Sequence, residues 1–255
     1  MTAVASDRRR RGRLLALFFV VATRTCDAFS YSTMMARSIA LQSSTRLHAS
    51  TSSSSSSLPD IRALQTAPFM KQVEYGTQLA SLLVDVSNDD TQQLKQSLQA
   101  QLSHSDGIRG FMVAYLSGQD GDDDDKIENV LLEALQDQFR QSDSTEDLVS
   151  LMCMNVVMPT AMVTMHEDPS NSANSARTAR RGLALLKQVK EESPEFEKNL
   201  KAIQKVAQRS SGGESLQQSS DDNALVKTWT DFFDKWGYKE QQAKDIEKAV
   251  NDLLA

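Results

Sequence analysis

Cysteine and histidine are scarce in this sequence, which holds two Cys and three His in 255 residues. Cys26 and Cys153 lie far apart, so no Cys-x-x-Cys pair is present for metal binding or redox chemistry. A protein metal centre needs three or four converging ligands, and His104 and His166 are the only histidines beyond His48. The sequence therefore predicts neither a metal site nor a cofactor.

Several motifs of catalysis and phosphate binding are also missing. The chain has no Gly-x-x-x-x-Gly-Lys, no Gly-x-Gly-x-x-Gly, no Gly-x-Ser-x-Gly and no His-Glu-x-x-His. These absences favour a non-catalytic role. A helical enzyme can still assemble its site from scattered residues. For that alternative, Cys153, Asn155 and His166 around residues 145–166 are the polar candidates.

Signals for β-strands are nearly absent, whereas helical spacing of apolar residues recurs along the chain. The hairpin turn pairs Asn-Gly and Gly-Asn do not occur. Three stripes follow the spacing of one helix face: Ile108, Phe111, Met112, Tyr115 and Leu116; Ile127, Leu131, Leu135 and Phe139; Phe196, Leu200, Ile203 and Ala207. We predict an all-α fold, an irregular multi-helix bundle. About nine helices are expected, near residues 68–86, 91–103, 107–117, 124–140, 145–166, 174–191, 194–209, 223–236 and 239–253.

Helix start signals support several of these boundaries. Asp90 stands ahead of Thr-Gln-Gln, and Ser193 precedes Pro194 and Glu195, which places a proline at the first helical position. Ser144 and Asp147 have the spacing of a capping box. Helices are therefore expected to begin directly after Asp90, Ser144 and Ser193.

The first 28 residues have the three-part layout of a signal peptide. A basic start, Asp7 to Arg13, is followed by the apolar run Leu14 to Ala22, and cleavage is expected after Ala28. Nine residues of helix rise only about 13 Å, which is too short for a hydrocarbon core of about 30 Å. We therefore predict a cleaved signal rather than a membrane anchor.

Residues 29–57 have the composition of a transit peptide. They contain no acidic residue, are rich in Ser and Thr, and carry Arg37 and Arg46. A signal peptide in series with such a stretch, joined at Ala28-Phe29, resembles the bipartite presequence of nuclear-encoded plastid proteins in algae with red-derived secondary plastids. In those presequences an aromatic residue follows the cleavage point, and Phe29 matches it. The resemblance implies import into the plastid stroma; the alternative is a secreted protein with a Ser-rich linker.

Without residues 1–57 the chain is strongly acidic. That segment holds eight Arg and two Asp, so a net charge of −6 for the whole chain becomes about −12 for residues 58–255. Nucleic-acid binding rests on clustered Lys and Arg, so a nucleic-acid partner is not expected. Composition divides the remainder into a helical core domain (58–209), a flexible linker (210–222) and a C-terminal helical pair (223–255).

Residues 148–165 form an eighteen-residue stretch without charge. Its length is at the lower limit for a membrane span, and a thylakoid or envelope protein is one alternative. We favour the central helix of a bundle, kinked at Pro159. Met154, Met158 and Met162 share one face there. Together with Cys153 they could supply sulfur ligands for Cu(I), although methionine more often fills irregular cores.

Two groups of residues are candidates for partner binding. Arg177, Arg180 and Arg181 share a helix face that suits an anion or an acidic protein, or that pairs within the acidic chain itself. A stripe at helical spacing contains both tryptophans: Trp229, Phe232, Phe233 and Trp236. Such a stripe docks into a partner's groove or packs on its own protein. The sequence thus predicts a structural, assembly or regulatory plastid protein that docks helices onto another plastid protein.

Overall fold

The computed structural model describes residues 58–84, 90–118, 127–141, 145–212 and 224–255. Within these ranges every regular element is helical and no strand occurs, which confirms the all-α prediction. The predicted presequence with Ala28 and Phe29 lies outside the described residues, as do residues 213–223, which hold most of the predicted linker.

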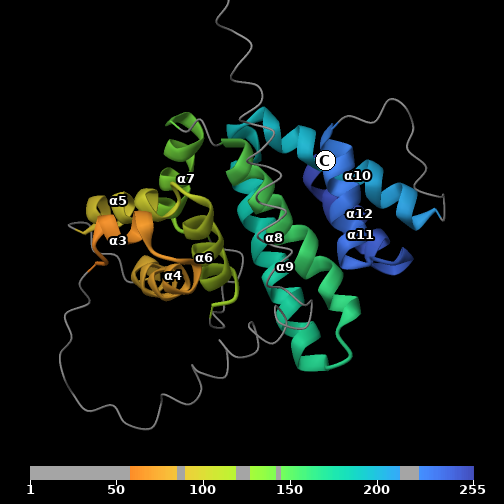
Figure 1. Ribbon diagram of the computed structural model, residues 1–255, viewed down its shortest axis with the longest axis horizontal. Helices are drawn as coiled ribbons and strands as arrows, with labels where there is room; N and C mark the ends of the chain where they lie inside the picture. Colours follow the sequence, from red (N-terminus) through yellow and green to blue (C-terminus); the bar gives the residue numbers. More distant parts are fainter. Residues whose placement is uncertain (1–57, 85–89, 119–126, 142–144, 213–223) are drawn as a thin grey trace, which may run out of the picture. The chain divides into compact units, whose positions relative to one another are not determined.

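Ten α-helices and one short 3-10 helix make up the described part of the chain (Figure 1). Their bounds are α3 Ile61–Thr66, α4 Phe69–Val84, α5 Thr91–Gln101, α6 Ser105–Leu116, α7 Asn129–Gln141, α8 Thr145–Met165, α9 Pro169–Val189, η2 Lys190–Glu192, α10 Pro194–Ser211, α11 Ala224–Trp236 and α12 Glu240–Leu254.

The observed helix starts follow the local capping chemistry. Asp90 and Ser193 precede α5 and α10 as predicted. The Ser193 hydroxyl accepts a hydrogen bond from the Glu195 amide at 3.3 Å, whereas the Asp90 side chain makes no capping hydrogen bond. Helix α9 begins five residues earlier than expected, because the Asp168 carboxylate accepts hydrogen bonds from two amides of its first turn. Ser144 lies outside the described residues.

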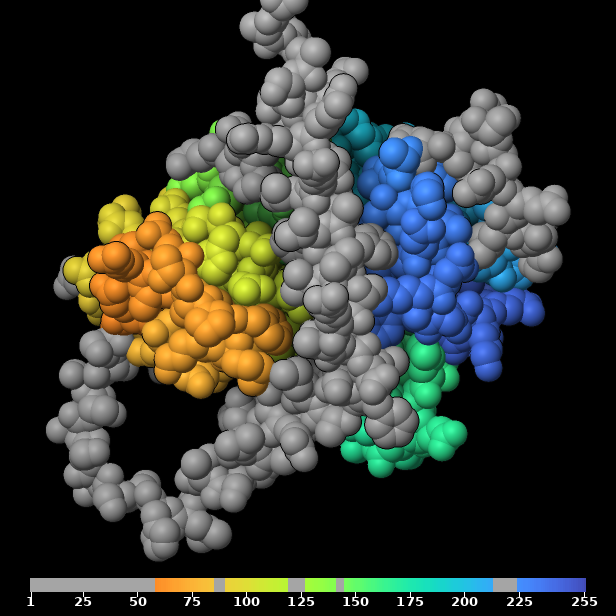
Figure 2. Space-filling view, viewed as in Figure 1, coloured from red at the N-terminus to blue at the C-terminus, as the bar shows by residue number. Residues whose placement is uncertain are grey.

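Helices α4 and α6 cross at very short range through two glycines. A Cβ atom on Gly110 would lie 2.5 Å from the Cβ of Gln72, and one on Gly76 would lie 2.8 Å from the Cα of Phe111. The buried Gln72 side chain donates a hydrogen bond to the backbone oxygen of Leu64 at 2.6 Å, which attaches α3 to the crossing. Figure 2 shows the resulting close packing of α3 and α4, in orange, on the yellow and green helices α5 and α6.

Helices α8 and α9 form an antiparallel hairpin joined by residues 166–168. Pro159 lies inside α8 and has no amide hydrogen, so the backbone oxygen of Asn155 loses its helical donor. Gly182 of α9 packs on that oxygen, since a Cβ there would stand only 3.0 Å from it. The absence of a side chain at residue 182 thus lets α9 approach the proline turn of α8.

The C-terminal helices α11 and α12 pack on α10, and α12 also packs on α8. Trp229 is 1 % exposed, and its indole nitrogen donates a hydrogen bond to the Asn199 side chain of α10 at 3.0 Å. Lys190 donates to the backbone oxygen of Leu253 at 2.6 Å, near the C-terminus of α12, where a cation is favoured. Buried residues before 213 and after 223 therefore belong to one hydrophobic core cluster.

Candidate functional site: an arginine face on helix α9

Helix α9 turns small and apolar residues inward and arginines away from α8. Its buried residues are Thr178, Ala179, Gly182, Leu185, Leu186 and Val189. Arg180 is exposed, whereas Arg177 and Arg181 are half-buried. These three arginines are called the arginine face below. They share one side of α9, as the spacing predicted, because residues three and four positions apart are neighbours on a helix.

Arg181 is held against helix α6. Its guanidinium carbon lies 5.0 Å from the ring centroid of Tyr115, in cation–π contact. A Cβ atom on Gly118, just beyond the end of α6, would lie 3.5 Å from Nη1 of Arg181. The guanidinium is therefore near the carbonyl end of α6, where the helix dipole favours a positive charge. Both contacts reduce the freedom of this side chain and fix its direction.

Tyr115 is itself anchored from its other end. Its ring is 2 % exposed, and its hydroxyl donates a hydrogen bond to the Glu128 carboxylate at 2.8 Å. Burial, reinforced by the charge of Glu128, raises the pKa of Tyr115, so the phenol stays neutral and remains a donor. Tyr115 thus joins the segment before α7 to the arginine side of α9.

The arginines crowd one another electrostatically. Burial, followed by the positive charges of Arg181 and Arg180, lowers the pKa of Arg177. The Arg177 guanidinium also donates a hydrogen bond to the Asn174 side chain at 3.1 Å, one turn earlier on α9. Guanidinium groups present a planar fork of donors that matches carboxylate and phosphate oxygens. This surface therefore has the chemistry to bind an anionic group.

The aromatic stripe of α11 lies differently from the arginine face. Trp229, Phe232 and Phe233 are buried and Trp236 is half-buried. Phe232 and Phe233 make edge contacts with Tyr238, which begins the turn into α12. The stripe thus packs on its own protein, which was one of the two alternatives that the sequence left open. Docking of a partner through these residues stays a prediction that would need α11 to leave α10.

A family model described as "Uncharacterised conserved protein UCP020893" matches residues 69–253, most of the chain. The chain belongs to this family.

The UCP020893 match begins at the first residue of α4 and ends within α12. It includes the arginine face, Tyr115 and the aromatic stripe, and it leaves out α3 and residues 1–57. No curated protein and no solved structure matches this UCP020893 member. The family assignment therefore covers the helices from α4 to α12.

Two of the three residues proposed for an enzymatic site, Cys153 and Asn155, do not come together in this UCP020893 protein. Burial raises the pKa of the Cys153 thiol to about 12, so it is protonated at neutral pH and a poor nucleophile. Asn155 uses its side-chain amide to bond the backbone oxygen of Leu151 at 2.8 Å. Cys153 and Asn155 are two positions apart and so project about 200° apart around α8. Within the described ranges, no three His, Cys, Asp or Glu side chains cluster as metal ligands.

The three methionines considered as copper ligands lie away from the thiol. Cys153 is on the buried side of α8, 1 % exposed, whereas Met154, Met158 and Met162 are half-buried on the other side. A single site cannot therefore use the thiol together with these thioethers. Helix α8 is the one described helix that is long and apolar enough to cross a membrane by length and composition. Its buried side packs on α6, α9, α10 and α12.

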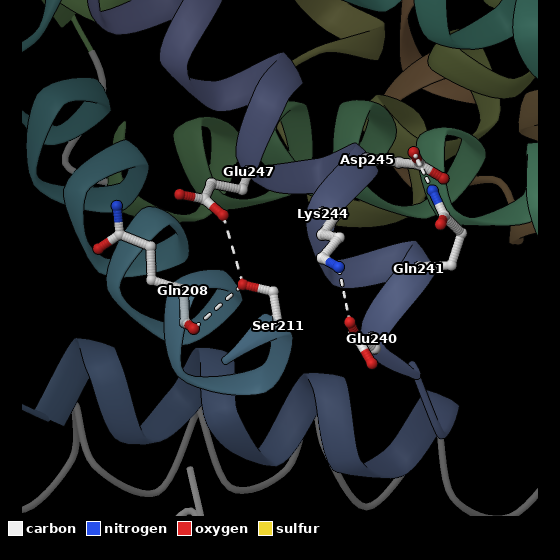
Figure 3. Close-up of polar contacts among 7 residues, drawn as sticks. All are labelled: Gln208, Ser211, Glu240, Gln241, Lys244, Asp245 and Glu247. Atoms are coloured by element: carbon white, nitrogen blue, oxygen red, sulfur yellow. Dashed lines mark hydrogen bonds and ion pairs between the residues drawn. The ribbon is translucent and has the colours of Figure 1, made fainter. Parts of the chain in front are cut away.

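The exposed side of α12 carries the other prominent group of polar residues (Figure 3). Two of its contacts lie within α12: Lys244 bonds Glu240 at 2.6 Å, and the Gln241 amide donates to Asp245 at 2.9 Å. The Ser211 hydroxyl of α10 donates to Glu247 at 3.4 Å. Opposite charges alternate along this face and pair with one another, and such exposed ion pairs contribute little to stability. The arginine face brings three guanidinium groups to one side of α9 and is the better candidate site.

Tyr115 and Glu128 are the site residues that the sequence did not indicate as such. Tyr115 appeared only as a member of an apolar helix stripe, and Glu128 precedes the helix that it was expected to occupy. Tyr115 contacts Arg181 from a helix more than fifty residues away in the chain, and Glu128 accepts the hydrogen bond of the Tyr115 hydroxyl. A buried tyrosine in an apolar stripe needs a hydrogen-bond partner for its hydroxyl. That requirement was the one feature of the sequence that could have indicated a polar contact at Tyr115.

Proposed function

We propose that this UCP020893 protein is imported into a plastid and there docks onto an acidic surface of another protein, in a structural, assembly or regulatory role. The docking element is the arginine face of α9. One observation carries the proposal: Arg181 is fixed by Tyr115 and the end of α6 beside two further arginines, one of them exposed. A guanidinium already held in position loses less side-chain entropy when it binds a carboxylate.

Electrostatics supports an acidic partner. Burial, and after it the positive charges of Arg181 and Arg180, lower the pKa of Arg177. A carboxylate supplied by a partner favours the charged guanidinium, and paired Arg–carboxylate contacts are among the stronger charge-assisted hydrogen bonds. Since residues 58–255 carry a net charge of about −12, a localised basic face also selects one orientation of docking.

The docking proposal is tested with two charge reversals on exposed residues. Arg180→Glu reverses one charge on the arginine face, and Lys248→Glu makes the same change on α12. Tagged versions expressed in the source organism are compared by native sizing of plastid extracts. We expect the wild type and the Lys248→Glu variant in a larger assembly and the Arg180→Glu variant as a free species. Equal elution of all three would rule out docking through this face.

Plastid import is tested separately with residues 1–57 fused to a fluorescent reporter. The proposal rests on the Ala28-Phe29 junction of the presequence. We expect the fusion to enter the plastid and a Phe29→Ala version to remain outside it. Secretion of the unaltered fusion would contradict the plastid assignment and would favour the secreted alternative.

A further inference from the structure

Helix α8 has a second side that the core covers only in part. Its buried residues occupy one broad arc: Leu148, Val149, Met152, Cys153, Val156, Val157, Thr160 and Ala161. The most apolar 18-residue stretch of the helix is nevertheless only 39 % buried. Apolar side chains on the remaining arc are therefore only partly covered: Leu151, Met154 and Met158 contact the core cluster and keep part of their surface in solvent. Apolar surface that stays partly exposed along one helix face is a candidate interaction site.

The partly covered arc is a continuous seam. Leu151, Met154, Met158 and Met162 are half-buried, and Met165 is 39 % exposed. At about 100° per residue, these five side chains lie within an arc of about 80°. They are called the methionine seam below. Methionine is flexible and polarizable and suits surfaces that adapt to a partner's apolar side chains.

Asp147 extends the seam by one turn at its N-terminal end. It lies four residues before Leu151 and so shares the same arc. The carboxylate is half-buried, and burial raises the pKa of Asp147. Burial is the single cause of that shift, so among the described residues neither a cation nor a hydrogen-bond donor offsets it. The place of Asp147 in the first turn of α8 favours its negative charge, whereas its partial desolvation disfavours it.

We propose that the methionine seam binds an amphipathic helix of a partner protein that has an apolar stripe and a Lys or Arg positioned to pair with Asp147. The apolar stripe of such a helix matches the uncharged middle of the seam, and its cation matches the anionic end at Asp147. The cation of the partner would compensate the desolvation of Asp147 and set the direction of the bound helix. From Asp147 to Met165 the seam runs about 27 Å, or five helical turns.

Charge also disfavours the other occupants. If a second copy paired in parallel, Asp147 would face Asp147; in an antiparallel pair it would face the end of α8 that Glu167 and Asp168 follow. A bilayer would need α8 to separate from four packed helices, and anionic headgroups would meet carboxylates at both ends. This surface is independent of the arginine face, which belongs to α9 and selects an acidic partner.

The probe is a synthetic Leu/Lys amphipathic peptide of about 18 residues, long enough to cover the seam. Its matched control has the same leucines with Glu in place of Lys. Both are titrated by fluorescence anisotropy against the full-length chain. We expect the Leu/Lys peptide to bind and the Leu/Glu peptide to bind at least about tenfold more weakly. Equal binding of the two peptides would overturn the proposal.

Four variants locate the binding site. Asp147→Asn should weaken Leu/Lys binding about tenfold, whereas Asp252→Asn, the same change on exposed α12, should have no more than about a twofold effect. Asp147→Lys should shift preference toward the Leu/Glu peptide. Met158→Glu should abolish binding. If circular dichroism shows that this variant is unfolded, Met158→Gln is used for the same test.

Three results would contradict the proposal. Equal losses for the Asp147→Asn and Asp252→Asn variants would show that only the overall negative charge attracts the peptide. Self-association that increases in the Asp147→Asn variant would assign the seam to a second copy. Flotation of the chain with neutral vesicles, abolished by Met158→Glu, would assign it to a membrane surface.

Discussion

The indole nitrogen of Trp229 donates a hydrogen bond to the side-chain oxygen of Asn199 at 3.0 Å, and both residues are buried. This contact joins α11 to α10 across residues 213–223 of the chain. The Asn199 amide in turn donates to the backbone oxygen of Glu195 at 2.9 Å. The buried tryptophan of the aromatic stripe is therefore oriented by a polar contact as well as by packing.

Trp229→Phe should lower the free energy of unfolding by about 2–4 kcal/mol. The change removes ring volume and leaves the Asn199 oxygen buried without its donor. The measurement is urea unfolding followed by circular dichroism. Combining Trp229→Phe with Asn199→Leu should recover part of the loss, because both polar partners are then removed. If the double variant shows the sum of the two single losses, the hydrogen bond is not the coupling between them.

Gly110→Ala should destabilise the fold by about 1–3 kcal/mol. The new methyl carbon would lie 2.5 Å from the Cβ and 2.6 Å from the carbonyl carbon of Gln72, so α4 and α6 would have to separate. Gly212→Ala is the control, since its nearest contact would be 3.3 Å and its change should stay within about 1 kcal/mol. Thermal melts of both variants decide the matter; similar melting temperatures would contradict the close crossing.

Removing the charge of Asp147, in the first turn of α8, and that of Asp168, the N-cap of α9, should have opposite effects on stability at neutral pH. Burial raises the pKa of Asp147 above its ordinary value of 3.8, so its ionisation disfavours the folded state, and stability falls as the pH rises through that window. Hydrogen bonds from Asn171 and Ser170 lower the pKa of Asp168, so its contribution is present above pH 3.8 and is lost as the pH falls below it.

The measurement is the urea midpoint of Asp147→Asn and Asp168→Asn at a series of pH values. Asp147→Asn should stabilise the protein near neutral pH and lose that advantage in acid. Asp168→Asn should destabilise it near neutral pH, with a difference that shrinks in acid. A rise in stability together with weaker peptide binding in Asp147→Asn would identify a residue kept for binding rather than for folding. The same sign for both variants would contradict these assignments.

Cys153 should be inert in the native protein. Its thiol is 1 % exposed, and its pKa is raised to about 12. In a Cys26→Ser background, we expect labelling by a thiol reagent to follow the unfolding equilibrium and to become fast only in urea. Rapid labelling of the native protein at neutral pH would show that α8 opens locally at this point.

Helix type and most helix positions follow from local patterns in the sequence. The start of α10 was predicted from Ser193 and Pro194, whose contribution lies within one turn. The start of α9 was missed because Ser and Asn after Pro169 are weak helix formers, and the Asp168 cap was not recognised. The six-residue α3 is too short for periodicity to indicate, and it is retained by tertiary contacts such as the Gln72 bond to Leu64.

The candidate site was only half predictable for a different reason. Helical spacing placed the arginines on one face, since that relation is local. The contact of Arg181 with Tyr115 depends on how α6 packs beside α9, and no pattern within either helix encodes that. The aromatic stripe was ambiguous on the same grounds, because an apolar helix face has one sequence pattern whether it meets its own core or a partner.

The short approach of Gly182 to the backbone oxygen of Asn155 bears on the order in which the chain assembles. The α8–α9 hairpin closes over residues 166–168, so its contacts are local and their loop-closure entropy is small. The contact between Gly182 and the Asn155 oxygen involves only α8 and α9, so it needs no residue beyond α9. We therefore expect the hairpin to form during synthesis, once residue 189 has emerged, with α10–α12 joining it afterwards. Both proposed docking surfaces are then carried by an early folding unit, with the later helices stabilising it from behind.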